Sequence, residues 1–435
     1  MTTTTLVRQA GDIAAPDRQH VRDVRRRPWR SSVITGAVAA EGIALAILVA
    51  ADGSPVWRLV RATLVAVACG AIVVQSRRRR STWCPWCLLI EGVAGTAAGA
   101  AIGVPHAIVA PGSVRAISGI TLLISGAIVL VTSAWILITR ARGWRKLAAL
   151  PVAFVLFQFA LLPLGLALFA TNRAPTEVGS LTPADFGLDY DDVLMPTRDG
   201  VVLSGWCIPS STGAAVVLLH GSGETRSATL EHAVVLARHG YGALLLDARG
   251  HGRSQGVAMD HGWHGDADIE AALTYLTTRP DIDASRLALV GLSMGGEEAV
   301  GALGSDPRIR AAIAEGVTGR VAGDDAWMPR DLTGWVQRGT NAVMYQLDDL
   351  LSDAHPPMSL RVAVAAGAPR HVLLIASIGV PAEQWAAEYL EDASPSTVDV
   401  WVAPQAPHAQ ALQIQPQEWE ERVTDFLNQH LNAGA

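Results

Sequence analysis

The residues from Arg286 to Gly296, RLALVGLSMGG, decide the fold of the C-terminal half of the chain. The segment 286–291, apolar after Arg286, is typical of a buried strand, and it leads directly into Gly291-x-Ser293-x-Gly295. Small residues on both sides of Ser293 allow a sharp turn from strand to helix that presents the serine hydroxyl. The N-terminus of the following helix favours negative charge at the same place. Ser293 is therefore the candidate nucleophile.

Short apolar runs alternate with amphipathic stretches on both sides of this motif. The expected strands are 191–196, 201–209, 214–219, 241–246, 286–291, 309–315, 371–376 and 397–403, and the stretches 228–238, 266–277 and 416–431 have helical spacing. Strands that alternate with helices predict a mostly parallel, doubly wound sheet. Sites in such sheets form beyond the carboxyl ends of the strands. Three unusual segments lie there, at 220–223, 247–252 and 291–296.

The segment from about 185 to 430 resembles an α/β-hydrolase, near the esterase, dienelactone-hydrolase and prolyl-oligopeptidase-like branches. The resemblance rests on His220-Gly221-x-Gly223, Asp247-x-Arg249-Gly250-x-Gly252, Gly291-x-Ser293-x-Gly295 and a late histidine. It implies catalytic residues in the chain order Ser, acid, His. The general base is then His408, after the last strand. The oxyanion hole would combine the backbone N–H of Met294 with one from Ser222 or Gly223.

The acid of this triad departs from the pattern of the family. The family places an aspartate shortly after the strand equivalent to 372–376, where this chain has Ile378-Gly379-Val380. Glu383 comes slightly later, and its extra methylene can offset a displaced backbone. Glu383 is our first choice, although an acid at the start of the expected helix 382–390 is favourable for the helix itself. Glu388, and Asp324 or Asp325 after the sixth strand, are the alternatives.

The segment from about 320 to 366 lies between two expected sheet strands, where this family inserts a small lid. It contains Trp327, Trp335, Met344 and Tyr345. These large side chains line either a substrate pocket or the interior of a packed cap, and the sequence favours neither.

The first 180 residues have a different composition from the rest. They hold 19 Arg or Lys and 7 Asp or Glu, whereas the remaining residues hold 15 and 33. Apolar stretches at 31–51, 57–75, 86–109, 117–139 and 150–171 each approach the roughly 20 residues that cross about 30 Å of hydrocarbon. We therefore expect a basic cytoplasmic segment at 1–30, an all-α bundle of about five transmembrane helices at 31–175, and the α/β-hydrolase domain at 181–435.

Clusters of basic residues fall on alternate connections between these stretches. They lie within 25–30, 77–80 and 140–146. Positive residues that flank spans remain in the cytoplasm, so the N-terminus is expected there. An odd number of spans then places the hydrolase domain outside. The expected location is the cell membrane, with several passes.

Two features of the membrane half remain open. Glu41 lies near the middle of the first expected span, where an acid is costly and is either functional or paired between helices. Cys84-Pro-Trp-Cys87 is either a redox dithiol or a structural element. No second cysteine pair follows, so a zinc site lacks ligands.

Taken together, these features predict a membrane-anchored serine hydrolase that cleaves an ester, thioester or small amide through an acyl-enzyme. Ser293, His408 and Glu383 would be the triad, without a metal or an organic cofactor. The expected partners are a small-molecule or lipid ester and membrane lipids, not nucleic acid. The alternative is a membrane protein whose hydrolase-like domain binds or senses a ligand and catalyses weakly, because the acid is displaced. The substrate and the oligomeric state do not follow from the sequence.

Overall fold

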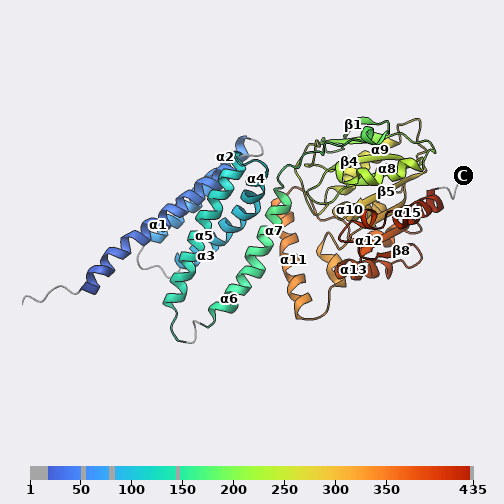
Figure 1. Cartoon of the computed structure of the whole chain (residues 1–435). Coiled ribbons are helices and arrows are strands. Elements are labelled where there is room, and N and C mark those ends of the chain that lie inside the picture. The colour runs from blue at the N-terminus through green and yellow to red at the C-terminus, as the bar shows by residue number, and fades with distance from the viewer. Residues whose placement is uncertain (1–17, 50–54, 78–83, 144–146, 432–435) are drawn as a thin grey trace, which may run out of the picture. The chain divides into compact units, whose positions relative to one another are not determined.

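The computed structural model of the chain describes residues 18–49, 55–77, 84–143 and 147–431 (Figure 1). The chain forms two compact units. The first takes in the residues up to Thr96 together with Thr121–Lys146, and the second takes in Ala97–Ile120 and everything from Leu147 onward.

The second unit is built on an eight-stranded sheet with the strand order β1-β2-β4-β3-β5-β6-β7-β8. The strands are β1 (Asp191–Pro196), β2 (Val202–Ile208), β3 (Ala215–Leu219), β4 (Gly242–Asp247), β5 (Leu287–Leu292), β6 (Ile309–Glu315), β7 (His371–Ser377) and β8 (Val398–Ala403). β2 pairs antiparallel with β1 and β4, and the other neighbours pair in parallel. The predicted mostly parallel sheet is thus confirmed.

Helices cover both faces of this sheet. One face carries α9 (Gly265–Leu276), α10 (Met294–Ser305), α12 (Leu360–Gly367) and α13 (Pro381–Glu391), and the other carries α8 (Leu230–Arg238) and α15 (Pro416–Leu431). Strand β3 contributes side chains to the apolar cores on both faces of the sheet. Ala215 and Val217 pack into the first layer, and Val216 and Leu218 pack into the second. Because side chains alternate along a strand, an unbroken apolar run suits a strand covered on both sides.

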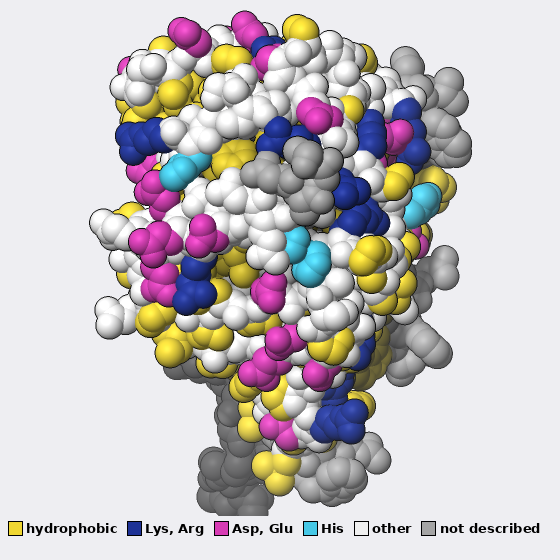
Figure 2. Space-filling model, turned by 90° about the vertical axis from the view of Figure 1, so that its right-hand side faces the viewer, with side chains coloured by type: hydrophobic (Ala, Val, Ile, Leu, Met, Phe, Trp, Pro, Cys, Tyr) yellow, Lys and Arg dark blue, Asp and Glu magenta, His cyan; other side chains and the backbone are white. Residues whose placement is uncertain are grey.

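Shorter elements complete the second unit and shape its loops. They are the π-helical turn η1 (Gly99–Gly103), α4 (Val104–Val109), η4 (Pro183–Phe186), η5 (Arg226–Thr229) and α14 (Ala411–Ile414). The face shown in Figure 2 carries interspersed acidic and basic side chains with scattered apolar ones. Such a mixture is typical of a surface in contact with water.

The segment expected to form a lid folds as η6 (Ala322–Trp327), α11 (Leu332–Leu351) and α12. Helix α11 packs along α7 (Leu162–Thr171), the end of an apolar helix that begins with α6 (Ala149–Leu156) and η3 (Phe157–Leu161) (Figure 1). The buried Met344 and Tyr345 of α11 share an apolar cluster with Ala167 of α7. For these two side chains, the interior of a packed cap is the correct interpretation.

The first unit contains α1 (Arg18–Val49), α2 (Pro55–Arg77) and most of α3 (Cys84–Ala98) and α5 (Val114–Arg140). Glycines bring α3 and α5 close together, since a Cβ on Gly92 would overlap the backbone of Leu130. Small residues at contacts of this kind are typical of packed membrane helices. Glu41 is 3% exposed and its carboxylate fills the space beside Gly95.

Three helical segments among the described residues are long and apolar enough to cross a membrane. They are Pro85–Val109, Val114–Arg140 and Ala149–Thr171, which correspond to the third, fourth and fifth expected spans. The first expected span contains a shorter apolar segment, Val33–Leu48. A bundle of five spans therefore remains a prediction.

Several residues used for the orientation and redox hypotheses lie outside the described side chains. These are the basic residues within 25–30 and 77–80, Arg145, Lys146 and Cys84. Cys69, Cys87 and Cys207 are free thiols. The orientation in the membrane therefore remains a prediction, and the role of the cysteine pair remains open.

Candidate active site

A strained turn presents Ser293 at the end of β5. The serine is the single residue between β5 and α10, and its backbone has φ 53° and ψ −118°. Such a conformation costs a residue with a side chain about 1–3 kcal/mol. The neighbouring glycines leave room for it, because a Cβ on Gly291 would overlap the carbonyl of Gly295, and a Cβ on Gly295 would overlap the carbonyl of Leu219. The Gly-x-Ser-x-Gly spacing is thus required by close backbone contacts.

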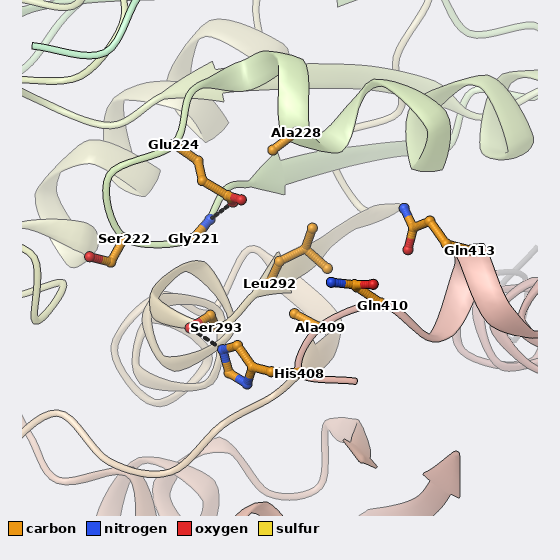
Figure 3. A pocket seen from close by; sticks show the side chains of 10 residues that line it. All are labelled: Gly221, Ser222, Glu224, Ala228, Leu292, Ser293, His408, Ala409, Gln410 and Gln413. Atoms are coloured by element: carbon orange, nitrogen blue, oxygen red, sulfur yellow. Dashed lines mark hydrogen bonds between the residues drawn. The ribbon is translucent and has the colours of Figure 1, made fainter. Parts of the chain in front are cut away.

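The structure brings Ser293, His408 and Glu383 together at the carboxyl ends of the strands. His408 lies in the loop after β8, and its Nε2 is 2.8 Å from the Ser293 hydroxyl oxygen (Figure 3). Its Nδ1 is 2.7 Å from Oε1 of Glu383. Glu383 stands in the first turn of α13, is 1% exposed, and accepts a second hydrogen bond from the Ser377 backbone N–H at 2.8 Å. The carboxylate is therefore fixed in its orientation toward the imidazole.

The other candidate acids are placed differently. Asp324 is buried and accepts hydrogen bonds from the backbone N–H groups of Arg320, Val321 and Leu360. Asp325 is buried in η6, and Glu388 is exposed on α13. Of the four acids, Glu383 alone has a hydrogen bond to His408 among the residues that the structure describes.

Buried carboxyl groups hold the surrounding loops. The hydrogen bond to Glu383 raises the pKa of His408, against the opposite effect of burial. Burial raises the pKa of Glu315, at the end of β6, to about 7, and its Oε1 accepts from the Ala411 N–H at 2.6 Å. Burial likewise raises the pKa of Glu297 to about 7. Glu315 thus supports the loop that carries His408.

The loop after β3 lies opposite Ser293 and begins with His220. Burial lowers the pKa of His220 to about 3, so its ring is neutral, and Nε2 accepts from the Ala248 N–H at 3.1 Å. The N–H of Gly221 donates to Oε2 of Glu224 at 3.0 Å (Figure 3). The N–H of Met294 is at the first position of α10, where a helix offers it no acceptor.

A pocket of about 460 Å³ opens beside the nucleophile (Figure 3). It is lined by Gly221, Ser222, Glu224, Ala228, Leu292, Ser293, His408, Ala409, Gln410 and Gln413. Of the residues proposed from sequence for the oxyanion hole, Ser222 is part of this lining, whereas Gly223 and Met294 are not. Trp327 and Trp335 are also absent from it, and Trp335 is 64% exposed.

Sequence reasoning missed a group of residues that reach this loop from the end of α7. Arg173 and Thr176 contact the loop or its neighbours, and Asp260 joins them. No motif marks these residues, because their contacts connect segments that are distant in the chain. Among the described residues, no group of three His, Cys, Asp or Glu side chains is placed to hold a metal ion.

The part of the chain that matches a known protein family lies in the second unit. Residues 210–366 match the family model described as serine aminopeptidase, S33. An uncharacterized protein of Mycobacterium tuberculosis is 38% identical over 113 residues, which are 25% of this chain and 40% of that protein. An α/β-hydrolase domain-containing protein of Arabidopsis thaliana is 34% identical over 127 residues, 28% of this chain and 40% of that protein. The chain thus spans less than half the length of these curated relatives.

Among solved structures, an esterase of Pyrococcus furiosus is 26% identical and covers 59% of this chain and 97% of its own, with a TM-score of 0.48. The strand order, the serine at the turn after β5 and the family match together support an α/β-hydrolase fold for the C-terminal part.

Proposed function

We propose that this chain is a membrane-anchored serine hydrolase that cleaves an ester, thioester or small amide through an acyl-enzyme. The observation that carries the proposal is the continuous hydrogen-bonded line from Glu383 through His408 to Ser293, beside an open pocket. A nucleophile, a base and an orienting acid in hydrogen-bond contact are what nucleophilic catalysis requires, and this geometry supports the proposal. Anchoring is supported by the apolar helix Ala149–Thr171, which precedes the hydrolase domain directly.

In the proposed reaction, His408 Nε2 takes the proton of Ser293 as its oxygen bonds to the substrate carbonyl carbon. The imidazolium then protonates the leaving group, whose bond to that carbon breaks and leaves an acyl-serine. Water repeats the two steps and releases the acid. Glu383 holds the imidazole in the required tautomer and stabilises its positive charge.

The developing oxyanion would be bound by the N–H of Met294 and by one from Ser222 or Gly223. The N-terminus of α10 supports this assignment, because it favours negative charge beside Ser293. The N–H of Gly221 is not a candidate, since it already donates to Glu224. The amides of Gln410 and Gln413 beside the apolar Leu292 and Ala228 suit a small or lipid-derived ester.

Labelling with a fluorophosphonate tests the proposal. The full-length protein in detergent should be labelled, and peptide mapping should place the label on Ser293. Ser293→Ala should not be labelled, whereas Ser305→Ala, at the end of the same helix α10, should be labelled like the wild type. A folded wild type that takes no label and hydrolyses no short acyl ester would favour the binding or sensory alternative.

The orientation in the membrane has its own test. We propose that the hydrolase domain lies outside the cytoplasm. A reporter that works only in the cytoplasm, fused after Ala435, should therefore be silent. An active reporter would place the hydrolase domain inside.

The pH dependence of hydrolysis should follow His408. Because Glu383 raises the pKa of His408, the base form should appear only above the usual value of about 6.5. We expect kcat/KM to rise with pH, with a midpoint above 6.5, and Glu383→Gln to lower that midpoint. The pair of protonated His408 and Glu383 also stabilises the fold. This contribution is complete at a pH below the pKa of His408 in the unfolded chain, and it is lost as the pH rises through the higher pKa of His408 in the folded protein. A midpoint below 6.5 in the wild type would contradict the assignment.

A further inference from the structure

The segment that follows α7 runs beside the loop after β3. The Thr176 hydroxyl donates to the Gly223 carbonyl at 2.8 Å, and the Gly179 N–H donates to the Ser227 hydroxyl at 2.8 Å. Both ends of the loop segment 223–227 therefore form hydrogen bonds with residues 176–179, which follow α7.

A second set of contacts holds the same loop at Ser222. The Ser222 hydroxyl donates to Oδ2 of Asp260 at 2.7 Å, and Arg173 Nε lies 3.3 Å from the same oxygen. The Asp260 N–H in turn donates to the Ala170 carbonyl of α7 at 3.1 Å. The Arg173 guanidinium also fills the space beside Gly223 that a Cβ would occupy. Ser222 is therefore held from the side of α7.

These contacts lie on either side of one peptide group. The peptide between Ser222 and Gly223 carries the Gly223 N–H. The Ser222 side chain before it and the Gly223 carbonyl, in the next peptide, are each held by a hydrogen bond. Gly223 has φ +70°, so its own backbone restricts this peptide little. Among the described residues, Thr176 is the only side chain that hydrogen-bonds the backbone of either residue.

We propose that Arg173 and Thr176 are positioning residues for the loop after β3, which would supply one donor of the oxyanion hole. Hydrolysis would then depend on the segment that follows α7. This inference rests on the proposed hydrolase function. An oxyanion donor is effective when it is fixed before the charge develops. Loss of the Thr176 hydrogen bond should therefore affect the transition state more than substrate binding.

The test compares Thr176→Val with Thr176→Ser in the full-length protein, on a short acyl ester. Valine keeps the shape but cannot donate, whereas serine restores the donor. We expect Thr176→Val to lower kcat about 10-fold with KM within about twofold, below the 10²–10³ that follows removal of an oxyanion donor. The kcat of Thr176→Ser should be close to that of the wild type. Arg173→Gln should lower kcat, as Thr176→Val does. Glu177→Gln, at the exposed neighbouring position, is the matched control and should be unchanged.

Three results would overturn the inference while leaving the hydrolase proposal intact. They are a Thr176→Val variant with the kcat of the wild type, an equal loss in the valine and serine variants, and a loss confined to KM. Thermal unfolding of each variant shows whether the fold is retained. A wild type without turnover would instead overturn the hydrolase proposal, and this inference with it.

Discussion

If the proposed triad operates, His408→Ala is expected to lower kcat by about 10⁶-fold, the loss measured when the base of a serine protease is removed. Without Nε2 at 2.8 Å, the Ser293 hydroxyl keeps its proton and is a weak nucleophile. The residual rate should come from the oxyanion hole and from binding alone. The measurement is kcat on a short acyl ester, with thermal unfolding as a check, since a side chain that is 49% exposed contributes little to the core.

Two further variants make this prediction specific. His355→Ala removes an 84% exposed histidine and should leave kcat unchanged. The double variant Ser293→Ala/His408→Ala should be no slower than either single variant, because residues that act as one unit are not additive. If His408→Ala retained one per cent of the wild-type kcat, His408 would not be the base.

Glu383→Gln is expected to lower kcat by about 10⁴-fold, the loss seen when the acid of a triad becomes an amide. Glutamine keeps the size of the side chain and can still accept from the Ser377 N–H. It lacks the charge that stabilises the imidazolium, and its amide permits the wrong tautomer of His408. The measurement is kcat at a pH where His408 is neutral, so that the shifted pKa does not enter the comparison.

The matched control is Glu388→Gln, because Glu388 lies on the same helix and is exposed. It should have the kcat of the wild type. If the effects were exchanged between the two variants, Glu388 would be the acid. Full activity in both would remove the carboxylate from the proposed mechanism.

Local sequence signals account for what could be predicted. The expected strand 214–219 corresponds to β3 (Ala215–Leu219), and the serine turn falls directly after β5. Both predictions depend on features within a few residues, an apolar run and a glycine spacing. The sequence indicates Glu383 less directly, because its distance from the end of β7 differs from the family pattern. An acid in the first turn of a helix is also explained by the helix itself.

Long-range contacts explain what could not be predicted. Thr176 and Gly223 are 47 residues apart, and the Gln158 amide donates to the Thr340 hydroxyl, 182 residues away. Nothing in the residue types or in their separation along the chain distinguishes either pair from polar residues that face water. The packing of α11 on α7 likewise depends on which apolar surfaces meet in the fold, and hydrophobic periodicity does not specify a partner.

The packing of α11 on α7 also bears on how such a chain could change during evolution. Because Met344 and Tyr345 share a buried cluster with Ala167, a hydrolase domain joined to a different helix would lose this packing of α11. It would also lose the bonds that Arg173 and Thr176 make. The last apolar helix, Ala149–Thr171, is therefore more than a connection to the hydrolase domain. Its last turns belong to the packing of the second unit, so replacing this helix would also change the interior of that unit.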